Sequence, residues 1–180
     1  MAAKRSAITV RPAADGELDA VCALERAAFG GDAEAALVAA LVRDAASYVP
    51  ELSLAAVEGE AIVGHVMLTR APAGGVPAVL LAPLAVAPDR QGRGIGGTLV
   101  REGLTRSREM GAALALVLGD PGYYGRFGFV AALPRGIRPP YEIETSEAWM
   151  AAELEPGALW AAQGAAALAE AFMDPALWRE

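Results

Sequence analysis

The stretch that decides the fold is Leu84-Ala-Val-Ala-Pro-Asp-Arg-Gln-Gly-Arg-Gly-Ile-Gly-Gly97, in which an apolar segment runs into a glycine-rich loop. The apolar run from Val79 to Val86 is typical of a central strand that is buried on both faces. We expect a helix from the loop to about Met110 and a second buried strand over Ala112–Leu118. Strand, loop, helix and strand form one βαβ unit, so the two strands should be parallel.

The glycine loop, Gln91–Gly97, has the composition of a phosphate-binding segment. Closely spaced glycines let backbone N–H groups converge without interference from side chains. The N-terminus of the following helix adds the positive end of its dipole. Together these features predict an anion cradle, most often one for phosphate. The alternative is a flexible loop without a ligand. A Walker loop is excluded, because no Gly-Lys-Ser/Thr closes the segment.

A dinucleotide site is a competing interpretation of this loop. Gly92, Gly94 and Gly97 satisfy the pattern G-x-G-x-x-G, and Asp120 follows about 20 residues later, where that motif has its ribose-binding acid. In the dinucleotide fold, however, the first glycine forms the turn directly after the strand. Here five residues separate the end of the strand from the first glycine, and we therefore disfavour NAD binding.

The rest of the chain predicts a mixed α/β or α+β sheet protein. Glu58-Gly59-Glu60 joins two strand-like segments, which predicts a hairpin. The region beyond about Val130 is less periodic, and Gly164 weakens the helix that its alanine content favours. The further expected elements are the strands Ala7–Val10, Leu52–Glu58, Ala61–Arg70, Tyr141–Ile143 and Trp149–Leu154, and the helices Asp15–Phe29, Asp32–Ala45 and Ala158–Phe172.

Length, charge and signal content limit the function classes. A chain of 180 residues suits one domain. A net charge of −7 argues against a nucleic-acid partner, because phosphate binding needs a basic face. The single cysteine, Cys22, cannot form an internal disulfide and fits a reducing compartment. Met1–Thr9 has no apolar run after Lys4 and Arg5, so it is not a signal peptide.

The uncharged stretch Ala71–Pro88 is long enough to raise the question of a membrane span. Its four prolines and two glycines are incompatible with a spanning helix, and we interpret it as a turn and a buried strand. We therefore expect a cytoplasmic protein with neither a membrane nor a nucleic-acid partner.

Two segments in the right order resemble the GNAT N-acetyltransferase superfamily. Gln91, Gly94 and Gly96 match the pattern Gln/Arg-x-x-Gly-x-Gly/Ala of its motif A. Leu118–Phe129, with a tyrosine ahead of Gly-Phe, is similar to its motif B. The resemblance covers about Ile8–Ala132 and is specific because both motifs occur at the right separation.

Val63-Gly-His-Val66 and Leu81-Ala-Pro-Leu-Ala-Val86 look most like the YhbS-like predicted acetyltransferases within this superfamily. The resemblance implies one acetyltransferase domain over residues 1–180, with a motif-bearing core at about 7–132 and an extension at about 133–180 that completes the sheet and the acceptor side. It also implies acetyl-CoA as co-substrate, and no metal.

The implied fold has a central, mostly antiparallel sheet flanked by helices, whose parallel pair splays apart to admit acetyl-CoA. Pro83 fits such a splay, because a proline in a fully paired central strand loses a ladder bond; a bulge without a ligand role is the alternative. The residues that the resemblance implies for cofactor binding are Leu84, Ala85, Val86, Gln91, Gly92, Arg93, Gly94, Ile95, Gly96, Gly97 and Arg126.

The implied reaction is direct transfer, in which a neutral amine attacks the thioester and a phenol protonates the departing CoA thiolate. Tyr124 matches the family's tyrosine and is the candidate acid, with Tyr123 as the competing choice. Because adjacent side chains rarely point the same way, we expect one ring in the core and the other at the site. Asp120-Pro-Gly replaces a stretch that often carries an asparagine, so contacts of Asp120 and Arg126 with CoA stay open.

The general base is not defined by the sequence. Glu25, Glu51, His65 and a water relay are the candidates. The acceptor is a small-molecule or peptide amine of unknown identity, and a homodimer is possible. The alternative function is a non-catalytic acyl-CoA-binding module or sensor of the same fold.

Overall fold

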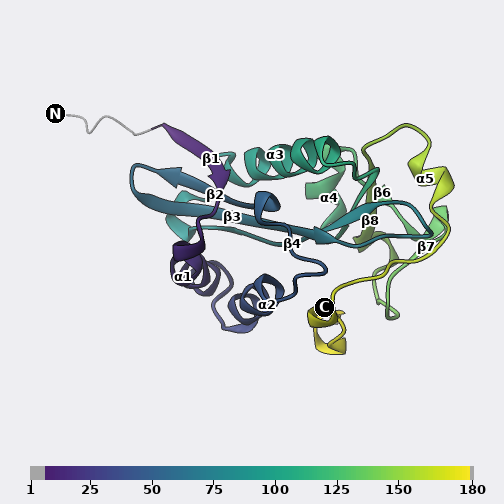
Figure 1. Cartoon of the computed structure of the whole chain (residues 1–180), viewed down its shortest axis with the longest axis horizontal. Helices are drawn as coiled ribbons and strands as arrows, with labels where there is room; N and C mark the ends of the chain where they lie inside the picture. The colour runs from purple at the N-terminus through teal and green to yellow at the C-terminus, as the bar shows by residue number, and fades with distance from the viewer. Residues whose placement is uncertain (1–6, 179–180) are drawn as a thin grey trace.

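A seven-stranded sheet in the order β1-β2-β3-β4-β5-β8-β6 forms the centre of the structure (Figure 1). This computed structural model describes residues 7–178, so Lys4 and Arg5 of the N-terminal segment lie outside the described residues. Neighbouring strands are antiparallel except β4 and β5, which are parallel as expected. The strands, including the small sheet β7-β9, are β1 (Ile8–Pro12), β2 (Ser53–Glu58), β3 (Ala61–Arg70), β4 (Ala78–Val86), β5 (Leu114–Leu118), β6 (Val130–Ala131), β7 (Ile137–Arg138), β8 (Trp149–Glu153) and β9 (Gly164–Ala165).

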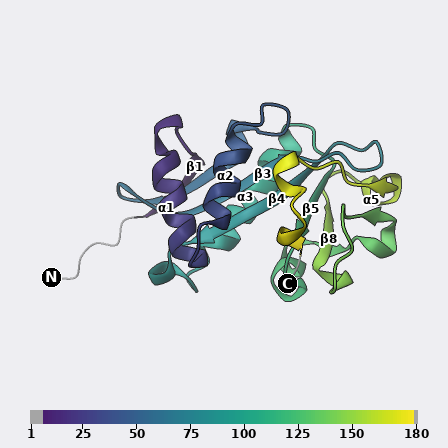
Figure 2. The same cartoon turned by 90° about the horizontal axis from the view of Figure 1, so that it is seen from below.

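Helices lie on both faces of this sheet. Figure 2 shows α1 and α2 side by side on one face, whereas α3 and α4 lie on the other face in Figure 1. In the part of the chain that the structure describes, no helix combines the length and the apolar character needed to cross a membrane. The helices are α1 (Leu18–Phe29), α2 (Ala33–Val42), α3 (Ile95–Glu109), α4 (Pro121–Tyr124) and α5 (Ala158–Ala161).

Alternation along β3 sends side chains into two apolar clusters, one on each face of the sheet. Val66 and Leu68 pack with Leu99 of α3, whereas Met67 packs with Leu41 of α2. All five side chains are fully buried. Burial of one such side chain contributes about 1.5–3 kcal/mol. Both faces of the sheet are therefore covered. A ligand can lie between two strands only where those strands separate.

The parallel pair opens before its strands end. β4 and β5 pair only over Ala78–Leu80 and Leu114–Leu116, although β4 continues to Val86. The β3–β4 register is also irregular at the level of Pro83, which lies beyond the last β4–β5 pair. The splay expected at this proline is thus confirmed, and it leaves the last residues of β4 without a strand neighbour on the β5 side.

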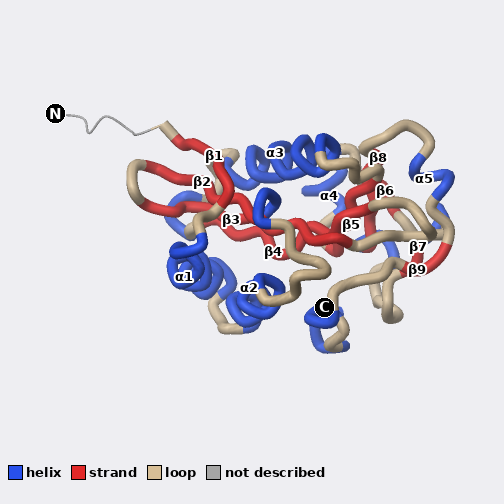
Figure 3. The backbone as a smooth tube through the Cα atoms, in the orientation of Figure 1, coloured by secondary structure: helices blue, strands red, loops and turns tan. Residues whose placement is uncertain are grey.

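The C-terminal region differs most from expectation. Beyond β8 it consists mainly of loops and single helical turns (Figure 3). Tyr141–Ile143 forms no strand; the Tyr141 ring packs near Trp178 instead, at a centroid distance of 6.4 Å. The expected long helix is reduced to α5, because Gly164 has a φ of 124°, outside the helical range.

Several element boundaries also differ from expectation by one to three residues, and two of the differences have a local explanation. β1 extends to Pro12, where we expected proline to end the strand near Val10. β1 is an edge strand, so the missing N–H can face away from the ladder. α2 ends at Val42 rather than near Ala45, and the last turn is closed by the N–H of Arg43.

Candidate functional site

The glycine loop connects the open end of β4 to the N-terminus of α3. Gly92 and Gly94 have φ values of 72° and 82°, a left-handed conformation that strains any other residue. A Cβ atom at either position would meet no other heavy atom within 4 Å, so the space above the loop is open. Gln91 fixes the loop from below, because its Nε2 donates to the carbonyl oxygen of Val86 at 3.1 Å.

A cavity of ≈ 440 Å³ lies between this loop, the end of β4 and the segment around α4. We call it the glycine-loop cavity. Leu84 and Val86 are half-buried and line it, whereas Ala85 between them is buried and does not. Its lining residues are Leu84, Val86, Arg90, Gln91, Gly92, Gly94, Ile95, Gly96, Gly97, Arg101, Tyr123, Arg126 and Phe127.

Nine of the eleven residues that the sequence implied for cofactor binding therefore meet around one cavity. The other two are Ala85 and Arg93. The side chain of Ala85 belongs to the opposite face of β4, as strand alternation requires. Arg93 is exposed, and its guanidinium donates to the carbonyl oxygen of Asp89 at 2.9 Å.

Aromatic side chains form the wall opposite the loop. α4 begins with Asp120, whose carboxylate accepts from the N–H of Gly122 at 2.8 Å and so serves as a helix cap. The Tyr123 and Phe127 rings lie 5.5 Å apart. A Cβ atom at Gly96 would lie 2.6 Å from the Tyr123 hydroxyl. The absence of a side chain at Gly96 is therefore what lets this phenol approach the N-terminus of α3.

Arginines give this cavity a positive lining in a protein of net charge −7. Arg126 lies 4.6 Å from the Tyr123 ring centroid, and Arg101 lies 5.3 Å from that of Phe127. Arg90 is held by Glu58 at 2.7 Å. Sequence reasoning missed Arg90, Arg101 and Phe127. Spacing could have identified Arg101, because it lies four residues after Gly97 and so on the same face of α3.

A second cavity of ≈ 320 Å³ adjoins β4 where α1, α2 and the C-terminal segment meet. We call it the C-terminal cavity. Leu84 lines both cavities, so both adjoin β4 where it has left β5. The residues that line it are Phe29, Glu34, Leu37, Leu80, Leu81, Ala82, Pro83, Leu84, Leu118, Gly119, Tyr124, Phe172, Leu177 and Trp178.

The two adjacent tyrosines line different cavities. Tyr123 lines the glycine-loop cavity and Tyr124 lines the C-terminal cavity. We had expected one ring at the site and the other in the core, but each ring faces a cavity. The ring of Tyr124 packs edge-on against Phe129 at 5.6 Å. Burial raises the pKa of both phenols, most strongly that of Tyr124. Tyr124 is therefore neutral at physiological pH and able to donate a proton or a hydrogen bond.

Two of the three side chains considered as general base are paired with each other in the interior. His65 Nδ1 and Glu25 Oε1 are 2.8 Å apart, and His65 Nε2 lies 3.1 Å from Ser53 Oγ. Glu25 and His65 are completely buried, and Ser53 is nearly so. The third candidate, Glu51, is exposed on a single 3-10 turn. None of the three lines either cavity.

The site contains no evident metal centre. Within residues 7–178, no three or more histidine, cysteine, aspartate or glutamate side chains are grouped as metal ligands would be.

A strand pair that opens onto a glycine loop and a helix N-terminus is the arrangement expected of an acyl-CoA-dependent acetyltransferase. The sequence matches the family described as acetyltransferase (GNAT) domain over residues 9–132. The chain therefore belongs to the GNAT acetyltransferase family, as the resemblance of its motifs predicted.

The chain is similar to two named N-acetyltransferases of Escherichia coli K12. It is 45% identical to the uncharacterised N-acetyltransferase YjhQ over 135 residues, which is 71% of this chain and 74% of YjhQ. It is 39% identical to the uncharacterised N-acetyltransferase YhbS over 119 residues, or 64% of this chain and 70% of YhbS.

Two solved structures are similar to this one over more than nine-tenths of the chain. The structure of E. coli YhbS in complex with CoA covers 96% of this chain and 94% of its own, with a TM-score of 0.84 and 32% identity. A GNAT acetyltransferase from Brucella melitensis in complex with acetyl-CoA covers 92% and 98%, with a TM-score of 0.73 and 31% identity. These comparisons confirm the expected fold class.

Proposed function

We propose that this protein transfers the acetyl group of acetyl-CoA to a primary amine by direct attack on the thioester. The observation that carries the proposal is that Leu84, beyond the point where β4 leaves β5, lines both cavities. One cavity has the lining of an anion and cofactor site, and the other provides a separate approach for the acceptor. Ternary-complex transfer needs such an arrangement, because both substrates must meet at one atom.

The glycine loop holds the CoA pyrophosphate. Its left-handed glycines leave the backbone N–H groups accessible, and α3, with 15 residues, directs its positive dipole end at the same point. Arg101 and Arg126 supply charge for the phosphates, since their guanidinium groups pack on rings rather than on carboxylates. The solved relatives with bound CoA and acetyl-CoA support this assignment.

The pantetheine arm extends along Leu84–Val86 as an added strand. This part of β4 has lost β5 as a neighbour, so its outer main-chain groups are free to pair with the amides of the arm. A main-chain N–H in the same segment then stabilises the negative charge that develops on the thioester oxygen.

Tyr124 protonates the departing thiolate. Its phenol is neutral because burial raises its pKa, and it lines the cavity from which the amine approaches. Tyr123 is the competing donor, because its hydroxyl lies at the N-terminus of α3. The variants Tyr124→Phe and Tyr123→Phe separate the two. The variant that removes the general acid should lose about 10²–10⁴-fold in kcat and keep its affinity for CoA.

Thermal unfolding with acetyl-CoA, CoA or NAD, combined with thiol release in the presence of amines, tests the proposal. A ligand at 100 times its Kd should stabilise the fold by about 2.7 kcal/mol, which raises Tm by several degrees. We expect a shift with both CoA species and none with NAD. Absence of a CoA shift refutes the cofactor assignment. A CoA shift without turnover on any amine favours the sensor function instead.

A cytoplasmic location is part of the proposal, because Cys22 is a free thiol.

A further inference from the structure

The C-terminal cavity is mainly apolar. Four aromatic rings, those of Phe29, Tyr124, Phe172 and Trp178, line it together with leucine, alanine and proline side chains. The indole N–H of Trp178 already donates to the carbonyl oxygen of Phe172 at 2.7 Å. Tyr124 and Glu34 are therefore the side chains left to bind a polar group of a ligand. A ligand that fits this cavity must be apolar over most of its surface.

The cavity is also small. Its volume of ≈ 320 Å³ is near the lower end of the ~300–1,000 Å³ found for small-molecule sites. Phe29 lies at its rim, because this residue is the last of α1 and its side chain is 49% exposed. Four parts of the chain form its walls, namely α1 with α2, the middle of β4, the segment 118–124 and the residues 172–178. An acceptor of a few carbon atoms beyond its amine fits this space.

Glu34 provides a single negative charge. It lies in the first turn of α2 and is half-buried, and among the ion pairs found between described residues none includes it. Among the residues that the structure describes, it is the only charged side chain that lines the cavity. A carboxylate next to aromatic rings attracts an alkylammonium ion through both its charge and the faces of the rings. The single carboxylate of Glu34 can neutralise one ammonium group of a ligand.

We propose that the acceptor is a small primary monoamine with an aromatic or branched aliphatic body, of the 2-phenylethylamine or 3-methylbutylamine type. The proposal rests on the proposed function, and it assigns Glu34 to capture of the ammonium form. The ammonium ion releases one proton to solvent, the neutral nitrogen attacks the carbonyl carbon, and the C–S bond breaks. Tyr124 protonates the departing thiolate, and the proton that the attacking nitrogen loses restores the phenol. The products are the N-acetylamine and CoA thiol.

The same lining disfavours the other amines considered. An aminoglycoside would bury many hydroxyl groups that have too few partners here. A polyamine would bring further ammonium groups, and Glu34 is the one carboxylate among the described lining residues that could pair with them. A lysine side chain on a folded protein would have to reach past Phe29 with only its four methylenes.

The test is a panel of acceptors assayed by thiol release with the full chain. The panel contains 2-phenylethylamine, 3-methylbutylamine, spermidine, kanamycin and a lysine-containing hexapeptide. We expect kcat/KM for the two monoamines to exceed that for every other member by at least 10-fold. Preference for spermidine, kanamycin or the peptide overturns the inference and leaves the proposed function intact.

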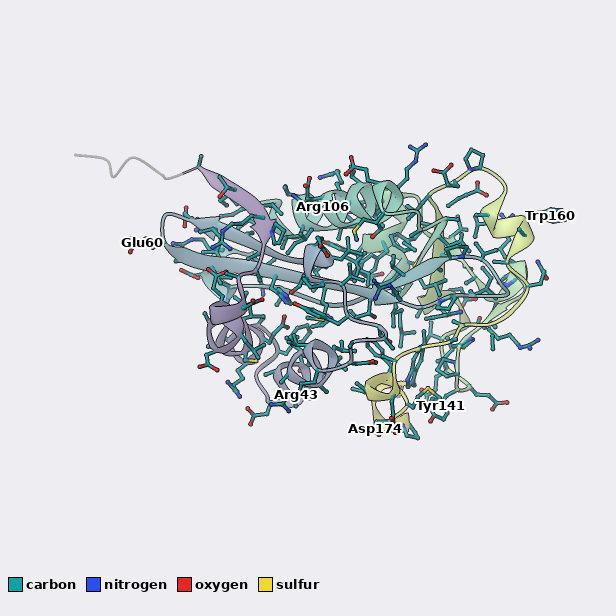
Figure 4. The ribbon with its side chains drawn as sticks, in the orientation of Figure 1. Arg43, Glu60, Arg106, Tyr141, Trp160 and Asp174 are labelled. Carbon is teal, nitrogen blue, oxygen red and sulfur yellow. The ribbon has the colours of Figure 1, made fainter. Side chains whose placement is uncertain are left out.

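Two variants and one control connect the preference to the cavity. Glu34→Gln should raise KM for the monoamines about 10-fold with little change in kcat, and Phe29→Ala should reduce the preference for 2-phenylethylamine. The control is Glu60→Gln, at the tip of the β2–β3 hairpin and far from the C-terminal segment (Figure 4). An unchanged KM in Glu34→Gln overturns the assigned role of Glu34.

Thermal unfolding with CoA distinguishes failure of the inference from failure of the proposed function. If CoA raises Tm and neither monoamine is acetylated, the inference is wrong. If CoA also fails to raise Tm, the proposed function is wrong.

Discussion

Replacing Glu25 with leucine should destabilise the protein strongly, and replacing His65 with leucine in the same chain should recover part of that loss. Both side chains are completely buried and 2.8 Å apart. Loss of one partner leaves a buried polar group without compensation, which costs about 3–5 kcal/mol. Loss of both leaves two leucine side chains in an apolar setting. The Ser53 hydroxyl then lacks the hydrogen bond that it formed with the His65 ring.

The four proteins of this double-mutant cycle should therefore deviate from additivity. We expect a coupling free energy of about 2–3 kcal/mol, the upper end of the range for residues in contact. Urea unfolding followed by circular dichroism at pH 7 gives the four free energies of unfolding. If the leucine variants do not fold, Glu25→Gln and His65→Gln supply a milder cycle with the same sign.

The partly exposed pair Glu102–Arg106 on α3 is the control, with a distance of 2.8 Å (Figure 4 labels Arg106). Its cycle should give only about 0.3–0.5 kcal/mol, because solvent screens exposed charges. Additivity of the Glu25 and His65 effects within about 0.5 kcal/mol would refute the argument that these two buried side chains compensate each other.

Three further outcomes are expected. Gly94→Ala forces a side chain into a left-handed position, so urea unfolding should show a loss of about 1–2 kcal/mol and the CoA-induced Tm shift should fall; an unchanged protein would contradict the loop geometry. Hydrogen bonds from Arg11 lower the pKa of Glu17 to about 2, so this pair should stabilise the fold above pH ~4.5 and lose that effect as pH falls towards 2, by less than about 1 kcal/mol because the pair is partly exposed; Glu17→Gln should flatten this part of the stability profile. Burial raises the pKa of Tyr124, so stability should fall as pH rises above about 10, and Tyr124→Phe should remove that loss in alkaline unfolding experiments.

The βαβ unit and the hairpin were predictable because their signals are local. Val79–Val86 is an uninterrupted apolar run, and the glycines that follow mark the loop directly. The pairing of Glu25 with His65 was not predictable, because 40 residues separate them and only the packing of α1 on β3 brings them together. Arg101, by contrast, was predictable from its spacing, because it follows Gly97 by four residues on the same face of α3.

The C-terminal region escaped prediction for a different physical reason. Its segments have little periodicity and are held by long-range contacts, such as the ring of Trp178 at 5.7 Å from that of Trp149. Tyr141 likewise donates to the carbonyl oxygen of Met173 at 2.6 Å. Contacts of this kind override local propensity and leave no pattern in the sequence. The C-terminal cavity depends on them, so its composition followed only from the structure.

The walls of the two cavities come from different stretches of the chain. Every residue that lines the glycine-loop cavity lies between 84 and 127, inside the family match at 9–132, whereas the C-terminal cavity is completed by Phe172, Leu177 and Trp178. Under the proposed function, substitutions after residue 132 change the acceptor while the glycine loop stays as it is. Exchange of residues 133–180 between relatives should then yield enzymes with new amine preferences.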